Sequence, residues 1–169
     1  AYGSVIREQT GKERPRVVVG RDNRPSSPEL GQALVRGIRA AGVDVLDIGT
    51  VPTPMVYWAE TTCGLDGAVQ ITGSHNPPEG NGIKMTVGGR ATYGATIRAL
   101  RDRIEDGPLA SGAGSYVAED VSDTYIADVA GRFRLARPVK VAVDCGNGSG
   151  ALVAERLLTT LGADVLPLF

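Results

Sequence analysis

Short apolar runs alternate with longer amphipathic segments along this chain. The first run extends from Arg16 to Gly20, and similar runs follow at 43–49 and 68–71. In the first run β-branched residues are continuous rather than alternating, which is typical of a strand buried on both faces of a parallel sheet. We therefore predict strands over these three ranges.

The segments between these strands carry the signals of helices. Residues 26–29 combine an N-capping serine with a proline suited to a first helical position, and Gly42 ends the segment. Apolar residues at four-residue spacing mark its predicted packing face: Leu30, Leu34 and Ile38. A second helix is predicted from Thr53 to Gly64, with Met55 and Trp58 in the core rather than in a ligand site. This alternation predicts an α/β fold with a mixed, mostly parallel sheet and helices on both faces.

Shorter elements are predicted beyond the third strand. A strand at 83–87 precedes a helix that ends at Gly107-Pro108. One face of that helix carries Ile97, Leu100 and Ile104. Residues 108–116 are rich in Gly, Ser and Ala and predict a surface connection, and a further helix over 121–133 is capped by Ser122.

A second alternation of strands and helices begins after Arg137-Pro138. It comprises a strand at 139–144, a glycine-rich turn, a helix at 152–161 and a strand from residue 163. A strand–helix–strand unit of this size cannot bury both faces of its sheet alone. We predict a first domain with its connecting helix over residues 1–136, and the opening of an incomplete second α/β domain over residues 137–169.

Composition narrows the possible partners. The 169 residues are 42% hydrophobic and 22% charged, which is typical of a globular protein. A net charge of -1 supplies no basic field for nucleic acid, and no apolar run approaches the roughly 18 residues of a membrane span. No signal peptide opens the chain, so a cytoplasmic location is expected. Cys63 and Cys145 are expected to be buried free thiols.

The loop from Thr72 to Lys84 carries the candidate chemistry. Ser74 lies in a Gly/Pro-rich stretch directly after an apolar strand, at the edge where open α/β sheets place their ligands. A serine hydroxyl is a poor nucleophile without activation, but once phosphorylated it becomes a doubly charged carrier. Taken alone, Ser74 is more typical of an ordinary turn, and Lys84 of an exposed strand position. His75 is either a surface group or a hydrogen-bond donor to the phosphate or a sugar hydroxyl.

Other residues of the same region are candidates for supporting roles. Gly73, Gly80 and Gly82 permit close approach of the backbone, while Asn76 and Asn81 are expected to shape the loop. Arg21 and Arg24 either bind phosphate or pair with nearby carboxylates, of which the candidates are Asp22, Glu29 and Asp47.

Four segments together resemble the α-D-phosphohexomutases, in particular their bacterial phosphomannomutase/phosphoglucomutase branch. They are residues 20–24, 51–54, the Thr72-Gly73-Ser74-His75-Asn76-Pro77-Pro78 loop, and 143–148. The resemblance implies an isomerase of carbohydrate metabolism, a phosphoprotein that moves phosphate between C1 and C6 of a hexose phosphate through phospho-Ser74 and a bisphosphate. It implies Lys84 as general acid/base and Mg²⁺ bound through a phosphate oxygen of Ser74. Glucose 1,6-bisphosphate is the implied activator.

The resemblance also implies that much of such an enzyme lies outside this chain. Family members have four domains, and their first strand, aspartate-rich Mg²⁺ loop, sugar-reading loop and last phosphate-binding loop have no counterpart here. We therefore expect a fragment that is inactive alone and is completed by the missing domains or by another chain. The amino-acid sequence of the serine loop is closer to that of the mannose/glucose branch than to that of the glucosamine branch.

Two other classes of function remain as alternatives. A serine hydrolase is poorly supported, because the one histidine is adjacent to Ser74 and the Gly-x-Ser-x-Gly elbow is missing. A non-catalytic phosphate-binding or assembly module, formed by the truncated domain, remains open. Residues 146–150 have a dinucleotide-like glycine pattern, which is weak alone and is predicted to be a tight strand-to-helix turn.

Overall fold

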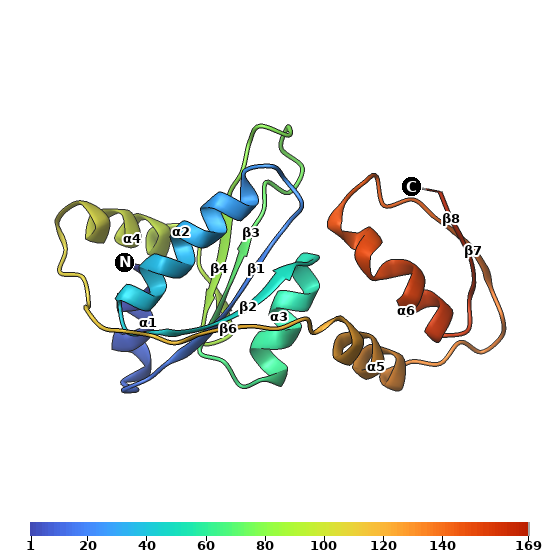
Figure 1. The fold of residues 1–169 in the computed structure, drawn as a ribbon, viewed down its shortest axis with the longest axis horizontal. Coiled ribbons are helices and arrows are strands. Elements are labelled where there is room, and N and C mark those ends of the chain that lie inside the picture. The colour runs from blue at the N-terminus through green and yellow to red at the C-terminus, as the bar shows by residue number, and fades with distance from the viewer. Residues whose placement is uncertain (169) are drawn as a thin grey trace.

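A computed structural model describes residues 1–168, which form a large sheet flanked by helices and a smaller unit beside it (Figure 1). The helices are α1 (Tyr2–Thr10), α2 (Ser27–Ala40), α3 (Thr53–Thr62), α4 (Ala95–Asp106), α5 (Ser122–Arg132) and α6 (Ala154–Thr160), with a 3₁₀ turn η1 (Ser149–Leu152). The strands are β1 (Arg16–Arg21), β2 (Asp44–Thr50), β3 (Gly67–Ile71), β4 (Ile83–Val87), β5 (Arg90–Ala91), β6 (Tyr116–Ala118), β7 (Lys140–Val143) and β8 (Asp164–Pro167).

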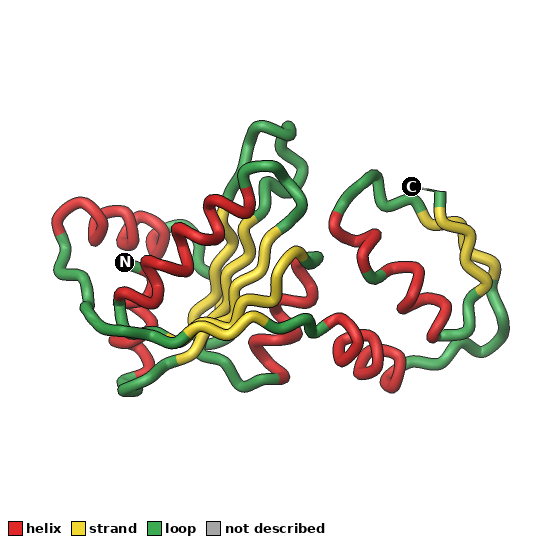
Figure 2. Tube along the Cα trace, viewed as in Figure 1, coloured by secondary structure: helices red, strands yellow, loops and turns green. Residues whose placement is uncertain are grey.

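The large sheet is mixed and mostly parallel. Its strand order is β5-β4-β3-β1-β2-β6, in which β3, β1, β2 and β6 run parallel and β4 and β5 pair antiparallel at one edge. Figure 2 shows these strands with helices on either side. The predicted fold class is confirmed.

Two apolar clusters cover the two faces of this sheet. Val18 of β1 packs with Met55 and Val56 of α3 on one face, whereas Val17 and Val19 pack with residues of α1 and α2 on the other. All three valines are fully buried. This explains the continuous apolar run of β1, because successive side chains point to opposite faces and both are covered. The assignment of Met55 and Trp58 to the core is also confirmed.

The predicted packing face of α2 is confirmed at Leu34 and Ile38 and is wrong at Leu30. The helix buries Gly31, Val35 and Ile38, whereas Leu30 is 41% exposed. A Cβ on Gly31 would lie 3.4 Å from the Ile71 side chain, so this small residue lets α2 approach the sheet closely. Adjacent helical positions lie about 100° apart, so burying Gly31 turns Leu30 towards solvent. Ser26 precedes the helix without a side-chain capping bond.

Similar differences occur further along the chain. Leu100 is buried in α4, but Ile97 and Ile104 of the same predicted face are 40% and 68% exposed. Ser122 is the first residue of α5 rather than its cap, and its backbone N–H donates to the Asp120 carboxylate at 2.9 Å.

The cysteines and three elements also depart from expectation. Both thiols are free, but Cys63 is exposed and Cys145 is half-buried. Cys63 follows the last residue of α3, beyond the part of the helix that packs on the sheet. Helix α1 and strands β5 and β6 were not predicted, and β6 extends from the end of the predicted 108–116 connection.

The smaller unit comprises β7, η1, α6 and β8. It packs against the apolar cluster that contains Val18, Met55 and Val56, which we call the first apolar cluster. Strands β7 and β8 are parallel and form a separate sheet with α6 beside them. Trp58 Nε1 donates to Asp128 Oδ2 at 2.8 Å, and the Trp58 and Tyr125 rings meet edge to face at 5.5 Å. Helix α5 therefore connects α3 to the smaller unit. The domain boundaries stay a prediction.

None of the helices within residues 1–168 is both long enough and apolar enough to cross a membrane.

Candidate active site

Ser74 lies in the connection between β3 and β4. Figure 1 shows this connection projecting beyond the sheet, beside the connection from β1 to α2. The Thr72 N–H donates to the Gly82 carbonyl at 2.9 Å and closes the base of the loop. Ser74 has φ of 53°, in the left-handed region that few non-glycine residues adopt. Such backbone persists only where surrounding contacts determine it, and it often occurs at functional sites.

The Arg24 guanidinium supplies those contacts. Its Nε donates to Asp22 Oδ2 at 3.1 Å, and Nη1 and Nη2 donate to four loop carbonyls at 2.5 to 3.0 Å. These carbonyls belong to Ser74, Asn76, Pro77 and Gly80. All five donors of the guanidinium are used. Arg24 therefore supports the loop and has no donor left for a phosphate in this arrangement.

Asp22 is the acceptor at the base of the loop. It is buried, and besides Arg24 Nε it accepts hydrogen bonds from Ser27 Oγ and from the Arg24 and Gly73 backbone N–H groups. Burial raises the pKa of Asp22, but these hydrogen bonds and one from Thr72 outweigh it, so the net pKa lies below its ordinary value. Asp22 is therefore ionised at neutral pH and holds the two connections together.

Gly73 and Asn81 also determine the shape of the loop. A Cβ on Gly73 would collide with the Arg24 guanidinium and with the Gly80 carbonyl. Asn81 Nδ2 donates to Ser26 Oγ and to Ser27 Oγ at 2.9 Å, and Asn81 Oδ1 accepts from the Gly82 N–H. Both residues thus act on the shape of the loop.

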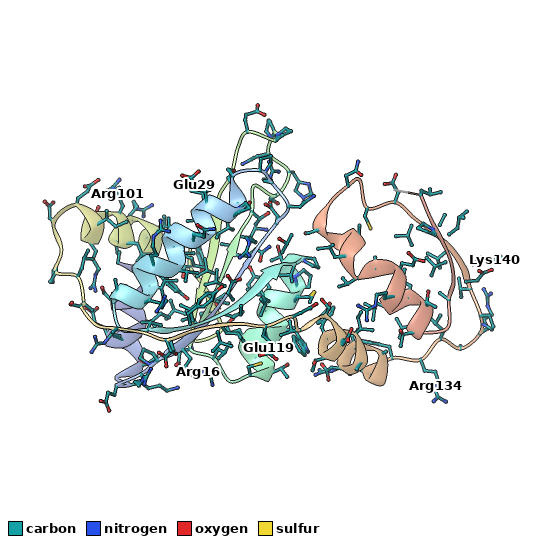
Figure 3. The ribbon with its side chains drawn as sticks, in the orientation of Figure 1. Arg16, Glu29, Arg101, Glu119, Arg134 and Lys140 are labelled. Carbon is teal, nitrogen blue, oxygen red and sulfur yellow. The ribbon has the colours of Figure 1, made fainter. Side chains whose placement is uncertain are left out.

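Arg21 lies apart from Ser74. Its guanidinium pairs with Asp47 at 2.9 Å, and the Tyr116 hydroxyl donates to the same carboxylate at 3.0 Å. Burial and Asp47 raise the pKa of Tyr116. This group borders a separate cavity of about 540 Å³ beside β6. The third candidate carboxylate, Glu29, is exposed on the first turn of α2 (Figure 3).

Ser74 borders a second cavity of about 400 Å³. Its walls are residues 22–25, the loop positions Thr72, Ser74, Asn76 and Pro78, and the turn at 146–149. His75 and Lys84 are exposed and are not part of this lining among the described residues. Lys84 pairs with Gln70 across β3 and β4, so their side chains share the face of the sheet on which α3 packs.

Sequence reasoning missed two parts of this cavity. Asn23 belongs to the segment at 20–24 that carries the family resemblance, but no role was predicted for its side chain. The turn at 146–149 has a glycine signature, but its proximity to Ser74 depends on the tertiary packing of α5 on α3.

No group of three or more His, Cys, Asp or Glu side chains able to hold a metal ion occurs within residues 1–168.

The fold and the loop define an α/β domain with a preorganised serine at the carboxyl edge of its sheet. Residues 1–110 match the family model described as phosphoglucomutase/phosphomannomutase, alpha/beta/alpha domain I. The chain belongs to the phosphoglucomutase/phosphomannomutase family, which confirms the resemblance seen in the sequence.

Individual relatives agree with this assignment. The chain is 43% identical over 162 residues to a phosphomannomutase/phosphoglucomutase of Pseudomonas aeruginosa, covering 96% of this chain and 35% of the relative. It is 45% identical over 157 residues to a phosphoglucomutase of Neisseria meningitidis serogroup B, covering 91% and 34%. The crystal structure of a phosphoglucomutase/phosphomannomutase family protein from Burkholderia thailandensis superimposes with a TM-score of 0.92 at 45% identity, covering 99% and 38%. The chain thus spans about a third of the length of these relatives.

Proposed function

We propose that Ser74 is the phosphoryl carrier of a hexose-phosphate mutase acting on mannose or glucose phosphates. The observation that carries this proposal is the left-handed Ser74 in a loop whose carbonyls are held by Arg24. Phosphoryl transfer requires mainly positioning and charge stabilisation from the protein, and a loop fixed before substrate binds supplies the first of these. The names of the relatives support the same reaction.

The reaction consists of two balanced transfers. The bond between Ser74 Oγ and phosphorus breaks as a sugar hydroxyl oxygen bonds to that phosphorus, and the proton that this hydroxyl loses is taken up by Ser74 Oγ. The resulting bisphosphate turns over and returns its other phosphate to Ser74 Oγ, so the carrier is regenerated. Lys84 and His75 are the proposed proton-handling and hydrogen-bonding groups. Neither residue borders the cavity beside Ser74 and both are exposed, so in this proposal they reach the transferring group from outside the cavity walls.

Mg²⁺ is the proposed metal cofactor. This chain offers one ligand, a phosphate oxygen on the exposed Ser74, and the other ligands would come from outside the described residues. When bound, the metal neutralises charge on the transferring group. Glucose 1,6-bisphosphate, or an equivalent, is the proposed activator. We further propose that turnover requires the remaining length found in the relatives, and that the reaction takes place in the cytoplasm.

Intact mass and turnover test this proposal. Incubation of the full-length protein with glucose 1,6-bisphosphate should add one phosphate that maps to Ser74, and Ser74→Ala should abolish both the label and conversion of glucose 1-phosphate to the 6-phosphate. Ser111→Ala is the matched control, because only the Ser111 carbonyl makes a described contact, with Arg7. Normal turnover in Ser74→Ala would end the proposal, and labelling of Ser74 by a fluorophosphonate would favour a hydrolase instead.

A non-catalytic phosphate-binding or assembly module is the second candidate. It is favoured by apolar side chains on the smaller unit, since Leu152 and Leu166 are 52% and 62% exposed. Light scattering of the 169-residue chain tests the assembly role, because such a module should self-associate. A phosphate-binding module should instead capture phosphate without any transfer to Ser74.

A further inference from the structure

The turn from Cys145 to Gly148 has an unusual conformation. Gly146 and Asn147 have φ of 53° and 57°, and the Gly148 N–H donates to the Cys145 carbonyl at 2.8 Å. Two consecutive positive φ values closed by this bond are the signature of a type I′ turn. Within residues 1–168, Asn147 and Ser74 are the two non-glycine residues with positive φ.

Strand pairing does not explain this turn. Type I′ turns usually join antiparallel strands in hairpins, where their twist matches that of the strands. Here β7 leads into η1 and α6, and it pairs in parallel with β8. The conformation instead presents the Asn147 carbonyl to Asn23, whose Nδ2 donates to it at 2.7 Å across 124 positions of sequence.

The partner of this carbonyl belongs to the machinery that holds Ser74. Asn23 lies between Asp22 and Arg24, and residues 146–149 border the same 400 Å³ cavity as Ser74. The smaller unit is anchored independently, because Val153 is 6% exposed within the first apolar cluster. Two contacts therefore hold the turn beside the cavity: the packing of Val153 in the first apolar cluster and the hydrogen bond from Asn23.

We propose that Asn23 and Asn147 are positioning residues that fix this turn as the second wall of the Ser74 cavity. Asn147 acts through its backbone: it tolerates the left-handed conformation and offers a carbonyl to Asn23. The wall limits where a group bound beside phospho-Ser74 can move, so it affects the transfer step more than initial binding. The inference rests on the proposed phosphoryl transfer at Ser74.

Three variants of the full-length protein separate a backbone role from a side-chain role. Asn23→Ala removes the donor, Asn147→Val opposes positive φ, and Asn147→Gly keeps both the conformation and the carbonyl. We expect the first two to lower kcat by about three- to tenfold, as for one lost hydrogen bond, with KM nearly unchanged. Their double mutant should lose no more than either single variant. Asn147→Gly should keep at least about threefold more activity than Asn147→Val.

Gln32→Ala removes an exposed amide elsewhere and is the control. An effect of Asn23→Ala no larger than that of Gln32→Ala would overturn the inference. So would an Asn147→Gly variant as impaired as Asn147→Val, because the side chain would then be the functional group.

Amide hydrogen exchange keeps the inference testable if the proposed function fails. Were Ser74→Ala to retain turnover, the carrier role would be lost, but the wall would still be judged by exchange at the Gly148 N–H. Asn23→Ala should speed this exchange by about threefold or more, as expected for a weakened local structure. Unchanged exchange would show that Asn23 does not hold the turn.

Discussion

Arg24 and Asp22 form an ion pair of 3.1 Å from which the rest of the Ser74 loop is organised. The carboxylate orients the guanidinium, whose other donors bind carbonyls of the loop. Because the cation is already satisfied by the protein, the loop conformation does not depend on a phosphate being present. A carrier serine fixed in advance loses little conformational freedom when its substrate binds.

Arg24→Lys should impair this organisation although the charge is kept. A lysine ammonium has three donors and no planar fork, so it cannot bind four carbonyls and Asp22 together. We expect at least a tenfold loss of phosphoryl transfer to Ser74, measured by intact mass against time. Arg101→Lys, at a position 62% exposed, is the control. Equal behaviour of the two variants would refute the role given to Arg24. Partial recovery of Arg24→Ala by added guanidinium would support it.

Acid should weaken the loop through Asp22. Its pKa is lower in the folded protein than in the unfolded chain, so the stability it contributes is present above about pH 3.9 and is lost as pH falls through the folded value. Urea unfolding between pH 2 and pH 6 measures this slope. Asp22→Asn should flatten the slope in the acid range. A slope identical to that of the unmutated protein would mean that another carboxylate is responsible.

Two glycines should respond in opposite directions to alanine. At Gly73 the added methyl group meets the Arg24 guanidinium and a backbone carbonyl, so we expect about 1–3 kcal/mol of destabilisation together with loss of transfer to Ser74. At Gly37, within α2, the new Cβ has nothing within 4 Å, and the better helix propensity should stabilise by about 0.5–1 kcal/mol. Chemical denaturation measures both changes. Equal tolerance of the two substitutions would contradict the packing described for the loop.

Met55→Ala should be among the more destabilising core substitutions. Met55 is fully buried between α3 and the sheet, and removal of such a side chain leaves a cavity that costs about 2–5 kcal/mol. Leu30→Ala, at the half-exposed position once expected in the core, should change the free energy of unfolding by about 0.5 kcal/mol or less. A larger effect at Leu30 would indicate that its helix face is covered in solution.

The elements of the large sheet could largely be predicted from sequence. Strands β1 to β3 and helices α2 and α3 have apolar runs bounded by glycine and proline, and those local signals determine where each element begins and ends. The packing of each helix was less predictable. Leu30 and Val35 are both apolar, and only the close approach at Gly31 decides which of them is buried. Strand β6 has three residues, too few for a periodic pattern.

The site was predictable only in part. The Gly/Pro-rich context identified the Ser74 loop, and Arg24 was expected either to bind phosphate or to pair with a nearby carboxylate such as Asp22. The partners of Arg24 could not be foreseen, because four of them are backbone carbonyls about fifty positions away, and every residue type has a carbonyl. The contact between Asn23 and Asn147 has the same origin. Asn23 donates to a carbonyl, so only folding shows which residue provides it.

The first apolar cluster includes Val121, Ile126 and Val153 together with Met55. The two parts of the chain therefore share one set of buried contacts instead of meeting across a solvated hinge. Heating should consequently melt the smaller unit together with the α3 face of the large sheet in one cooperative transition, since both lose buried contacts of the same cluster.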